Sequence, residues 1–210
     1  MTKSALETDC ENFSGAEIVV DVLRQRPDVY LVAVAGIPGS GKTTLCETLR
    51  ARLPNAVILP MDGYHIPKSQ LDAEALRRRG ARHTFASTDF RADLQRLRET
   101  RCGEFPAFDH AEQDPRPNAI RVTPEAKLVI VEGLYLLMLD WQLEDLFDLT
   151  IFLDCDLNVA LERTAARHLA CGLETSMEAA RHRAESNDRL NALDILEDGC
   201  RERADLIVKS

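Results

Sequence analysis

Residues Gly36 to Thr43 read GIPGSGKT and constrain the fold more than any other feature of the chain. They match the pattern GxxxxGK[ST] in full. In such a loop the glycines let backbone N–H groups turn towards an anion, and the following helix directs its positive end at the same point. The pattern is meaningful only between a strand and a helix. The sequence therefore predicts a strand, a phosphate-binding loop (P-loop) and a helix in direct succession.

Both neighbours of the loop have the required character. Residues 29–35 read VYLVAVA, an apolar run typical of a strand buried on both faces. Residues 42–53 have a helical pattern that ends at Pro54. Lys42 would act in catalysis by bridging the β- and γ-phosphates of ATP, and the Thr43 hydroxyl would bind Mg²⁺. The predicted nucleotide-binding residues are Gly36, Gly39, Ser40, Gly41, Lys42, Thr43 and Thr44.

The rest of the chain alternates apolar runs with helical patterns, which favours a parallel sheet covered on both faces. We therefore predict an α/β three-layer sandwich in which residues 1–210 form a single domain. Four further strands are expected at 56–61, 128–131, 149–153 and 205–208. Helices are expected at 71–79, 88–101, 157–170 and 176–198. The proline-rich segment 105–124 predicts a loop.

Local capping patterns predict where some helices begin. Ser14 with Glu17, and Thr175 with Glu178, have the spacing of capping boxes. Asp154 precedes a predicted helix and is a candidate N-cap.

Three acidic residues, Asp62, Glu132 and Asp154, follow predicted strands at the edge where ligands bind in wound α/β sheets. Asp62 closes LPMD and could bind an acceptor hydroxyl and take its proton, as a catalytic base does. The alternative for Asp62 is an Asp-Gly turn that bonds only local backbone. Glu132 closes VIVE and could bind Mg²⁺ or substrate, or be a simple turn residue.

Arginines recur in the second half of the chain, in a region of roughly 160–190. Arg163 and Arg167 lie four residues apart, on one face of a predicted helix. With Arg181 and Arg183 they could form a lid that neutralises charge on a transferring phosphoryl group. The alternative is a solvated helix face, since most arginines are exposed.

Candidate contacts for the acceptor are the pairs Tyr64-His65 and Asp109-His110, beside Asp62 and in the proline-rich segment respectively. An isolated surface histidine is usually inert, and that alternative stays open.

Composition narrows the class of protein. The formal net charge of −9 argues against nucleic acid or an anionic membrane as a partner. No stretch reaches the roughly 18 apolar residues of a membrane span, and the N-terminus lacks an apolar run, so a cytoplasmic location is expected. The cysteines form no CxxC pair, which favours reduced packing thiols. The sequence does not decide between a monomer and a homodimer.

The chain resembles the phosphoribulokinase/uridine kinase/pantothenate kinase group of P-loop kinases. The likeness rests on GIPGSGKTT, MDGYH, FPAFDH and VIVEGLYLL, followed by the arginine-rich segment and RAESND…ADLIV. Within the group it looks most like bacterial proteins labelled as kinases of fructose transport systems. The resemblance implies ATP and Mg²⁺ as cofactors, strand order 2-3-1-4-5, Asp62 as the catalytic aspartate, Arg163 and Arg167 in the lid, and Asp109-His110 at the acceptor. Uridine kinases usually have Asp-Ser-Phe-Tyr where this chain has DGYH, and pantothenate kinases have Asn in place of Tyr135.

These features predict an ATP-dependent kinase of a small hydroxyl-bearing metabolite, with a sugar such as fructose as a candidate acceptor. A non-catalytic ATP-binding regulatory module is the alternative. A GTPase switch is disfavoured because no Asn/Thr-Lys-x-Asp segment is present.

Overall fold

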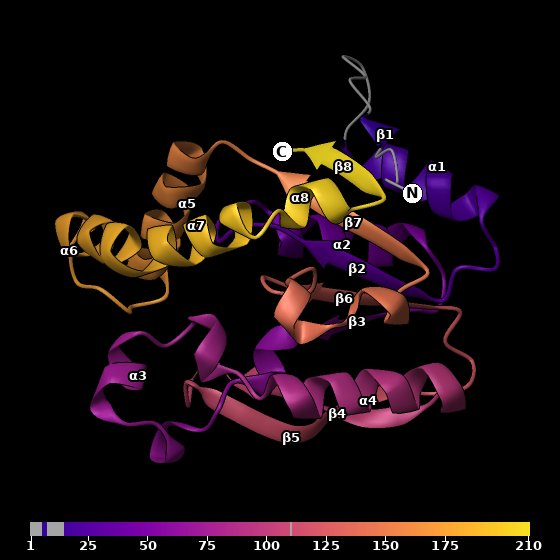
Figure 1. Cartoon of the computed structure of the whole chain (residues 1–210), viewed down its shortest axis with the longest axis horizontal. Coiled ribbons are helices and arrows are strands. Elements are labelled where there is room, and N and C mark those ends of the chain that lie inside the picture. The colour runs from indigo at the N-terminus through magenta and orange to yellow at the C-terminus, as the bar shows by residue number, and fades with distance from the viewer. Residues whose placement is uncertain (1–5, 8–14, 110) are drawn as a thin grey trace.

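The central sheet is parallel, with strand order β1-β8-β7-β2-β6-β3 (Figure 1). The computed structural model describes residues 6–7, 15–109 and 111–210. The strands are β1 (Leu6–Glu7), β2 (Leu31–Ala35), β3 (Ala56–Pro60), β6 (Leu128–Gly133), β7 (Leu149–Asp154) and β8 (Leu206–Lys209). Counting only the predicted strands, the order is 2-3-1-4-5, which confirms the α/β sandwich. The additional strand β1 extends the sheet beyond β8.

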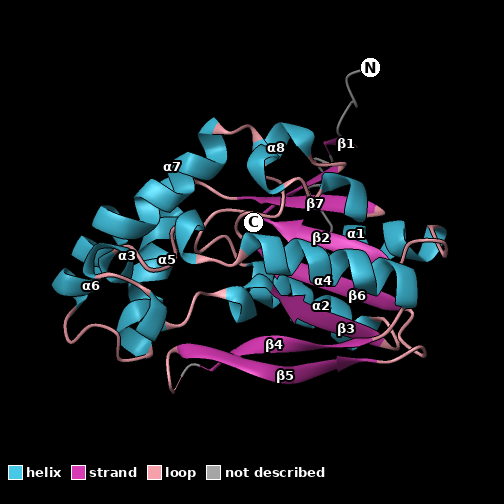
Figure 2. Cartoon of the chain, turned by 60° about the horizontal axis from the view of Figure 1, so that its bottom comes forward, coloured by secondary structure: helices cyan, strands magenta, loops and turns pink. Residues whose placement is uncertain are grey.

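Alternating side chains of each central strand face two separate cores. Val32 and Val34 of β2 pack with the apolar side chains of α1 (Gly15–Gln25) and α2 (Lys42–Arg52). Leu31 and Ala33 face the opposite way, into a core that α4 (Ser87–Thr100) shares. Figure 2 shows the sheet between these helical layers. This two-sided burial explains the uninterrupted apolar runs of the sequence.

The prediction of a loop at 105–124 is wrong, because these residues form most of an antiparallel hairpin. Its strands are β4 (Gly103–Asp109) and β5 (Asp114–Val122). Pro106 lies at a register irregularity between Phe105 and Ala107. Pro115 and Pro117 lie in β5, which pairs only with β4 and is therefore an edge strand, where a missing N–H is tolerated.

Several predicted helix starts are corrected. Asp156, not Asp154, caps α5 (Leu157–Ala170), and Ser176, not Thr175, caps α6 (Met177–Arg183). Asp154 instead pairs with Arg201 at 3.2 Å. The predicted helix 176–198 is interrupted by a π-helical turn, η6 (Ala184–Asp188), before α7 (Arg189–Glu197). Ser14 lies outside the described residues.

The connecting segments contain short helical turns. The remaining α-helices are α3 (Ala73–Arg77), which Asp72 caps and which is shorter than predicted, and α8 (Cys200–Arg203). The 3₁₀ turns are η1 (Met61–Tyr64), η2 (Lys68–Gln70), η3 (Arg82–Thr84), η4 (Leu139–Trp141) and η5 (Glu144–Leu146). None of the helices in the described part of the chain has both the length and the apolar character that spanning a bilayer requires.

Candidate active site

The P-loop connects β2 to α2, as predicted, and packs closely against α5. Gly39 has φ +76°, and a Cβ there would lie 2.0 Å from the carbonyl oxygen of Ala160 and 2.5 Å from Thr164 Oγ1. A side chain at Gly39 would therefore be strained and would collide with backbone. This close approach joins the loop to the helix that carries Arg163 and Arg167.

The Lys42 side chain folds back over its own loop. Its Nζ donates to the carbonyl oxygens of Gly36 at 3.0 Å and Ile37 at 2.8 Å, and lies 3.4 Å from Ser40 Oγ. Burial lowers the pKa of Lys42 to about 8, an effect that the negative charge of Glu132 opposes. A phosphate entering the loop would offer this ammonium group oxygens of full negative charge in place of neutral carbonyls.

Thr43 and Glu132 meet at the mouth of the loop. Thr43 Oγ1 donates to Glu132 Oε1 at 2.5 Å. Glu132 lies in β6 opposite Val34 of β2 and Pro60 of β3, so three strand ends converge on it. Burial raises the pKa of Glu132 above its ordinary value, and the hydrogen bond from Thr43 opposes this shift.

The residues at this point suit Mg²⁺. A hydroxyl and a carboxylate are hard oxygen donors, the kind that Mg²⁺ prefers. Among the described residues no group of three or more His, Cys, Asp and Glu side chains could hold a metal ion by itself. Mg²⁺ commonly takes one or two protein ligands and completes its shell with water and phosphate oxygens. Thr43 and Glu132 could be those two protein ligands.

Asp62 lies in η1, directly after β3, with an exposed side chain. Its negative charge acts on the pKa of Lys42, of Glu132 and of His65. The two predicted strand-end carboxylates and the predicted catalytic lysine are thus brought within electrostatic reach of one another.

The two predicted lid arginines point to different places. The positive charge of Arg167 acts on the pKa of both Lys42 and Glu132, so Arg167 lies within electrostatic range of the P-loop. Arg163 Nη1 instead donates to Ser210 Oγ at 2.9 Å and contacts Cys155 Sγ at 3.5 Å, beyond the ends of β8 and β7.

Arg181 and Arg183 are engaged elsewhere in the structure. Arg181 pairs with Glu162 at 3.0 Å, and Arg183 with Glu174 at 3.5 Å. The structure therefore does not gather all four arginines at the P-loop.

Tyr64 is wrong as a predicted acceptor contact. Its side chain is buried against Phe90, and its hydroxyl donates to Asp93 Oδ2 at 2.7 Å. His65 remains near Asp62: its Nδ1 lies 2.8 Å from the Asp62 carbonyl oxygen, and its ring lies between those of Phe85 and Phe108. Burial lowers the pKa of His65, so the neutral ring, with Nδ1 donating, is the favoured form.

Asp109 is the last residue of β4, beside the turn of the hairpin. The Asp109 carboxylate accepts from the backbone N–H groups of Ala111 at 2.9 Å and Glu112 at 3.1 Å, so it shapes the turn. His110 lies outside the described residues.

Sequence reasoning missed Arg79, which holds this region together. Its guanidinium pairs with Asp114 at 2.7 Å and donates to the carbonyl oxygens of Ile66, at 3.2 Å, and Gln113. Gly63 was also missed: a Cβ there would lie 2.3 Å from the carbonyl oxygen of Pro106. Gly63 belongs to the MDGYH motif and Arg79 to no motif, but the sequence shows the partners of neither residue, because these are far away in the chain.

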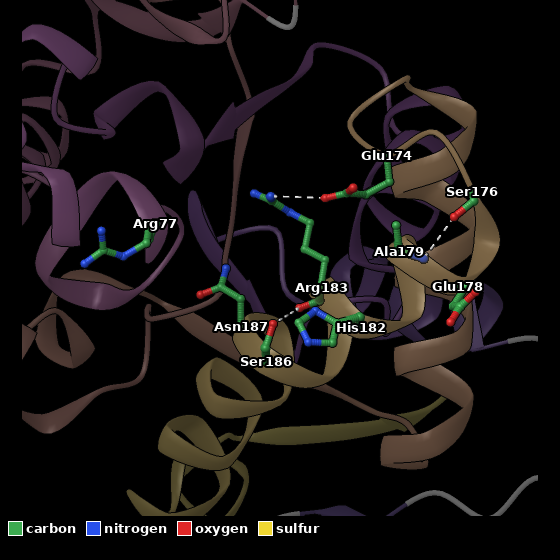
Figure 3. A pocket seen from close by; sticks show the side chains of 9 residues that line it. All are labelled: Arg77, Glu174, Ser176, Glu178, Ala179, His182, Arg183, Ser186 and Asn187. Carbon is green, nitrogen blue, oxygen red and sulfur yellow. Dashed lines mark hydrogen bonds and ion pairs between the residues drawn. The ribbon is translucent and has the colours of Figure 1, made fainter.

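A separate cleft of about 570 Å³ opens between α3 and α6 (Figure 3). It contains none of Lys42, Asp62 and Glu132, so it is not the phosphate site. Its charges are mixed, because Arg77, Arg183, Glu174 and Glu178 all line it. The lining residues are Arg77, Glu174, Ser176, Glu178, Ala179, His182, Arg183, Ser186 and Asn187.

Residues 31–172, more than half of the chain, match the model of the phosphoribulokinase / uridine kinase family. The chain is 35% identical to "Putative uridine kinase C227.14" of Schizosaccharomyces pombe over 89% of its own length and 88% of that protein. The crystal structure of a "putative fructose transport system kinase" from Silicibacter sp. TM1040 superposes with a TM-score of 0.80 at 34% identity, over 93% of this chain and 99% of that one.

Other relatives agree with this match. The chain is 39% identical to "ATP-dependent kinase-like protein notR'" of Aspergillus versicolor, over 65% of its length and 87% of that protein. ATP and Mg²⁺ are the cofactors of these kinases, which transfer a phosphoryl group to a hydroxyl of a small molecule. The P-loop, the two strand-end carboxylates and the matched residues together show that the chain belongs to the phosphoribulokinase / uridine kinase family.

Proposed function

We propose that the chain transfers the γ-phosphoryl group of ATP to a hydroxyl of a sugar such as fructose. The observation that carries the proposal is the convergence of charged groups from separate elements. Lys42, Asp62, Glu132 and Arg167 come from α2, η1, β6 and α5, and each acts electrostatically on at least one of the others. In-line phosphoryl transfer depends on positioning and charge neutralisation of this kind.

In the proposed reaction, Asp62 accepts the proton of the acceptor hydroxyl as its oxygen forms a bond to the γ-phosphorus. The bond from the γ-phosphorus to the bridging oxygen of ADP breaks at the same centre. Lys42 leaves its carbonyl partners for the β- and γ-phosphates, and Arg167 neutralises charge on the transferring group. Mg²⁺, held by Thr43 and Glu132, supplies further positive charge when bound. Arg163 bonds to Ser210, whose Oγ would lie 3.6 Å from a Cβ on Gly41, so it borders the P-loop but is given no part in this transfer.

The choice of a sugar rests on two supports. The similar crystal structure from Silicibacter sp. TM1040 is that of a "putative fructose transport system kinase". The aromatic rings nearest Asp62 are already packed: His65 lies against Phe85 at 4.0 Å and Phe108 at 4.9 Å between ring centroids, and Tyr64 is buried. Such packing favours an acceptor bound by hydrogen bonds over one that needs an aromatic surface for stacking.

The test is ADP release with Mg·ATP across fructose, other sugars, uridine, pantothenate and glycerate. We expect turnover that depends on a sugar and that Lys42→Ala and Asp62→Asn both abolish. If only uridine supports turnover, the proposed acceptor is wrong and the proposed phosphoryl transfer still holds. Tight ATP binding without a phosphorylated product for any acceptor would instead support a non-catalytic ATP-binding regulatory module.

A further inference from the structure

The lid contains a carboxylate that the proposed reaction does not use. The side chain of Asp188 is only 13% exposed, and its Oδ2 lies 3.6 Å from His168 Nε2 of α5. Within the described residues this oxygen has no hydrogen-bond donor. A buried, unsatisfied carboxylate oxygen is costly and points to a partner that reaches it in another state of the molecule.

The π-helical turn η6 fixes the position of Asp188. Its wide hydrogen bond runs from Arg189 N–H to the Ala184 carbonyl oxygen, a local distortion that is frequent at functional sites. Asn187, the residue before Asp188, donates from Nδ2 to the carbonyl oxygen of Arg79 at 3.2 Å and accepts from Arg78. The turn is therefore anchored to the segment after α3, and α6 and α7 lie beside α5 (Figure 1).

Three arginines surround Asp188, and two of them have other partners. Arg78 donates to Asn191 Oδ1 at 3.1 Å as well as to Asn187. Arg183 is directed at Glu174, as Figure 3 shows. Arg167 makes no hydrogen bond or ion pair with any described side chain, yet its charge acts both on Asp188 and on Lys42 of the P-loop. Arg167 precedes His168, which contacts Asp188, and follows Thr164 of the same helix by three residues, where Gly39 of the P-loop packs, so it lies between the buried carboxylate and the phosphate site.

His168, the other neighbour of Asp188, cannot serve as its counter-charge. Burial lowers the pKa of His168 to about 4, so the ring is neutral at pH 7. Burial raises the pKa of Asp188 to about 6, and the positive charge of Arg167 opposes this shift. At pH 7 Asp188 is thus mostly ionised beside a neutral histidine.

We propose that Asp188 is a positioning residue for Arg167: when a γ-phosphate is bound, the guanidinium bonds to Asp188 Oδ2 on one side and to the phosphate on the other. A planar guanidinium between a carboxylate and a phosphate can bond to both at once. The bond to Asp188 would then limit the orientations open to the long Arg167 side chain in the complex with nucleotide. The inference rests on the γ-phosphate role proposed for Arg167, but not on the identity of the acceptor.

The experiment measures how strongly the protein distinguishes Mg·AMPPNP from Mg·ADP, expressed as the ratio of their dissociation constants. Both complexes occupy the P-loop, and only the first carries a γ-phosphate. We expect Arg167→Ala and Asp188→Asn each to lower the preference for Mg·AMPPNP by about tenfold, typical of one charge-assisted hydrogen bond. The double variant should lose no more than Arg167→Ala alone, because the two residues act as one unit.

Glu185→Gln is the matched control, since it makes the same acid-to-amide change in the same turn. Glu185 is exposed and pairs with Arg189 at 3.5 Å on the outer face. The ratio of the dissociation constants for Mg·AMPPNP and Mg·ADP should be the same in Glu185→Gln as in the unaltered chain. Should Asp188→Asn not fold, Asp188→Glu keeps the charge but displaces it by one methylene, and an intermediate ratio is expected.

Three results would overturn the proposal: an unchanged ratio in the Asp188 variant, losses that add in the double variant, or an unchanged ratio in Arg167→Ala. A merely structural role for Asp188 would lower the melting temperature and weaken both nucleotides equally. If the ratio behaves as expected but no acceptor is phosphorylated, the kinase proposal fails while this inference stands.

Discussion

Lys42 and Thr43 owe their positions to the residues directly around them, whereas Asp62 and His65 depend on segments far away in the chain. The donor side, residues 36–43, is set by its own glycines and by the helix that follows it. The acceptor side, residues 61–65, is packed against β4 at Gly63 and is enclosed by Phe85 and Phe108. The backbone of the P-loop is therefore encoded locally, although Gly39 and Thr43 also contact α5 and Glu132, whereas the shape that would recognise an acceptor arises wholly from tertiary contacts.

The largest effect that would separate the two sides is expected at Asp62. Asp62→Asn keeps the size of the side chain but removes the base, so turnover should fall by about 10²–10⁴-fold. Because Asp62 lies outside the P-loop, the dissociation constant of Mg·ATP should change by less than about threefold. Steady-state turnover and nucleotide titration on the same preparation measure the two quantities.

Asp154→Asn is the matched control for this experiment. Asp154 also ends a strand of the sheet, but it pairs with Arg201 at 3.2 Å. We expect it to keep turnover within about threefold, in line with the modest worth of a partly exposed ion pair. If Asp62→Asn keeps full activity, Asp62 is not the catalytic base. The proposed difference in catalytic role between the two sides would then be wrong.

A pair of glycine substitutions tests whether the two sides can be damaged separately. Gly39→Ala forces a Cβ to 2.0 Å from the Ala160 carbonyl oxygen, and Gly63→Ala forces one to 2.3 Å from that of Pro106. Each should lower the free energy of unfolding by about 1–3 kcal/mol through overpacking. Gly39→Ala should weaken Mg·ATP binding by about tenfold or more, and Gly63→Ala should instead raise the KM for the acceptor.

Equal losses of nucleotide affinity in both glycine variants would show that the two sides form one cooperative unit. Thermal unfolding of each variant, with and without Mg·ATP, separates the loss of stability from the loss of binding.

The same contrast explains how far the sequence alone predicts this molecule. Apolar runs predicted every central strand, because burial on both faces leaves a strong local signal at residues such as Val32 and Ile130. Lys42, Thr43, Asp62 and Glu132 were predicted because each has a fixed place relative to a strand end. Their convergence follows from the geometry of a parallel sheet.

The rest could not be predicted, since it depends on partners distant in the sequence. The prolines of β5 suggested a loop because edge pairing with β4 leaves no local mark. Tyr64 looked available beside Asp62, yet its hydroxyl is bonded to Asp93, 29 residues away. Arg79 had no motif at all, although it joins Ile66, Gln113 and Asp114.

The lowered pKa of Lys42 predicts a pH effect confined to the donor side. Phosphates bind the ammonium form, so the dissociation constant of Mg·ATP should be flat below pH 8 and rise by up to tenfold per unit above it. Between about pH 8 and the ordinary 10.5 the unfolded chain binds more protons than the folded one, so nucleotide-free stability should rise with pH there. Calorimetry in two buffers of different ionisation enthalpy would detect proton uptake on binding above pH 8.

Lys42→Arg supplies the control, because a guanidinium does not titrate in this range. Its affinity for Mg·ATP should be lower but independent of pH between 7 and 9. A pH dependence that persists in Lys42→Arg would assign the titration to another group, such as the nucleotide itself.

The smallest effect is expected from the ion pair that braces the acceptor side. Arg79 and Asp114 are 2.7 Å apart with side chains only 12% and 30% exposed, and the Asp114 carboxylate also accepts from Lys68 N–H at 3.0 Å. Arg79→Met keeps much of the aliphatic length of the side chain and removes the guanidinium group, so it should lower the free energy of unfolding by about 1–3 kcal/mol. The acceptor KM should rise by a few fold, and Mg·ATP affinity should stay unchanged.

Arg82→Met makes the same change at an ion pair that is far more exposed. Arg82 and Asp140 are 3.1 Å apart with side chains 46% and 55% exposed, so the loss should stay below about 1 kcal/mol. In a double-mutant cycle, Arg79→Met with Asp114→Asn should show a coupling of about 1 kcal/mol. If Arg79→Met weakens the binding of Mg·ATP as much as that of the acceptor, the ion pair between Arg79 and Asp114 supports the whole site. Donor and acceptor sides would then be one structure, in which Arg79 links the hairpin to the P-loop through the lid.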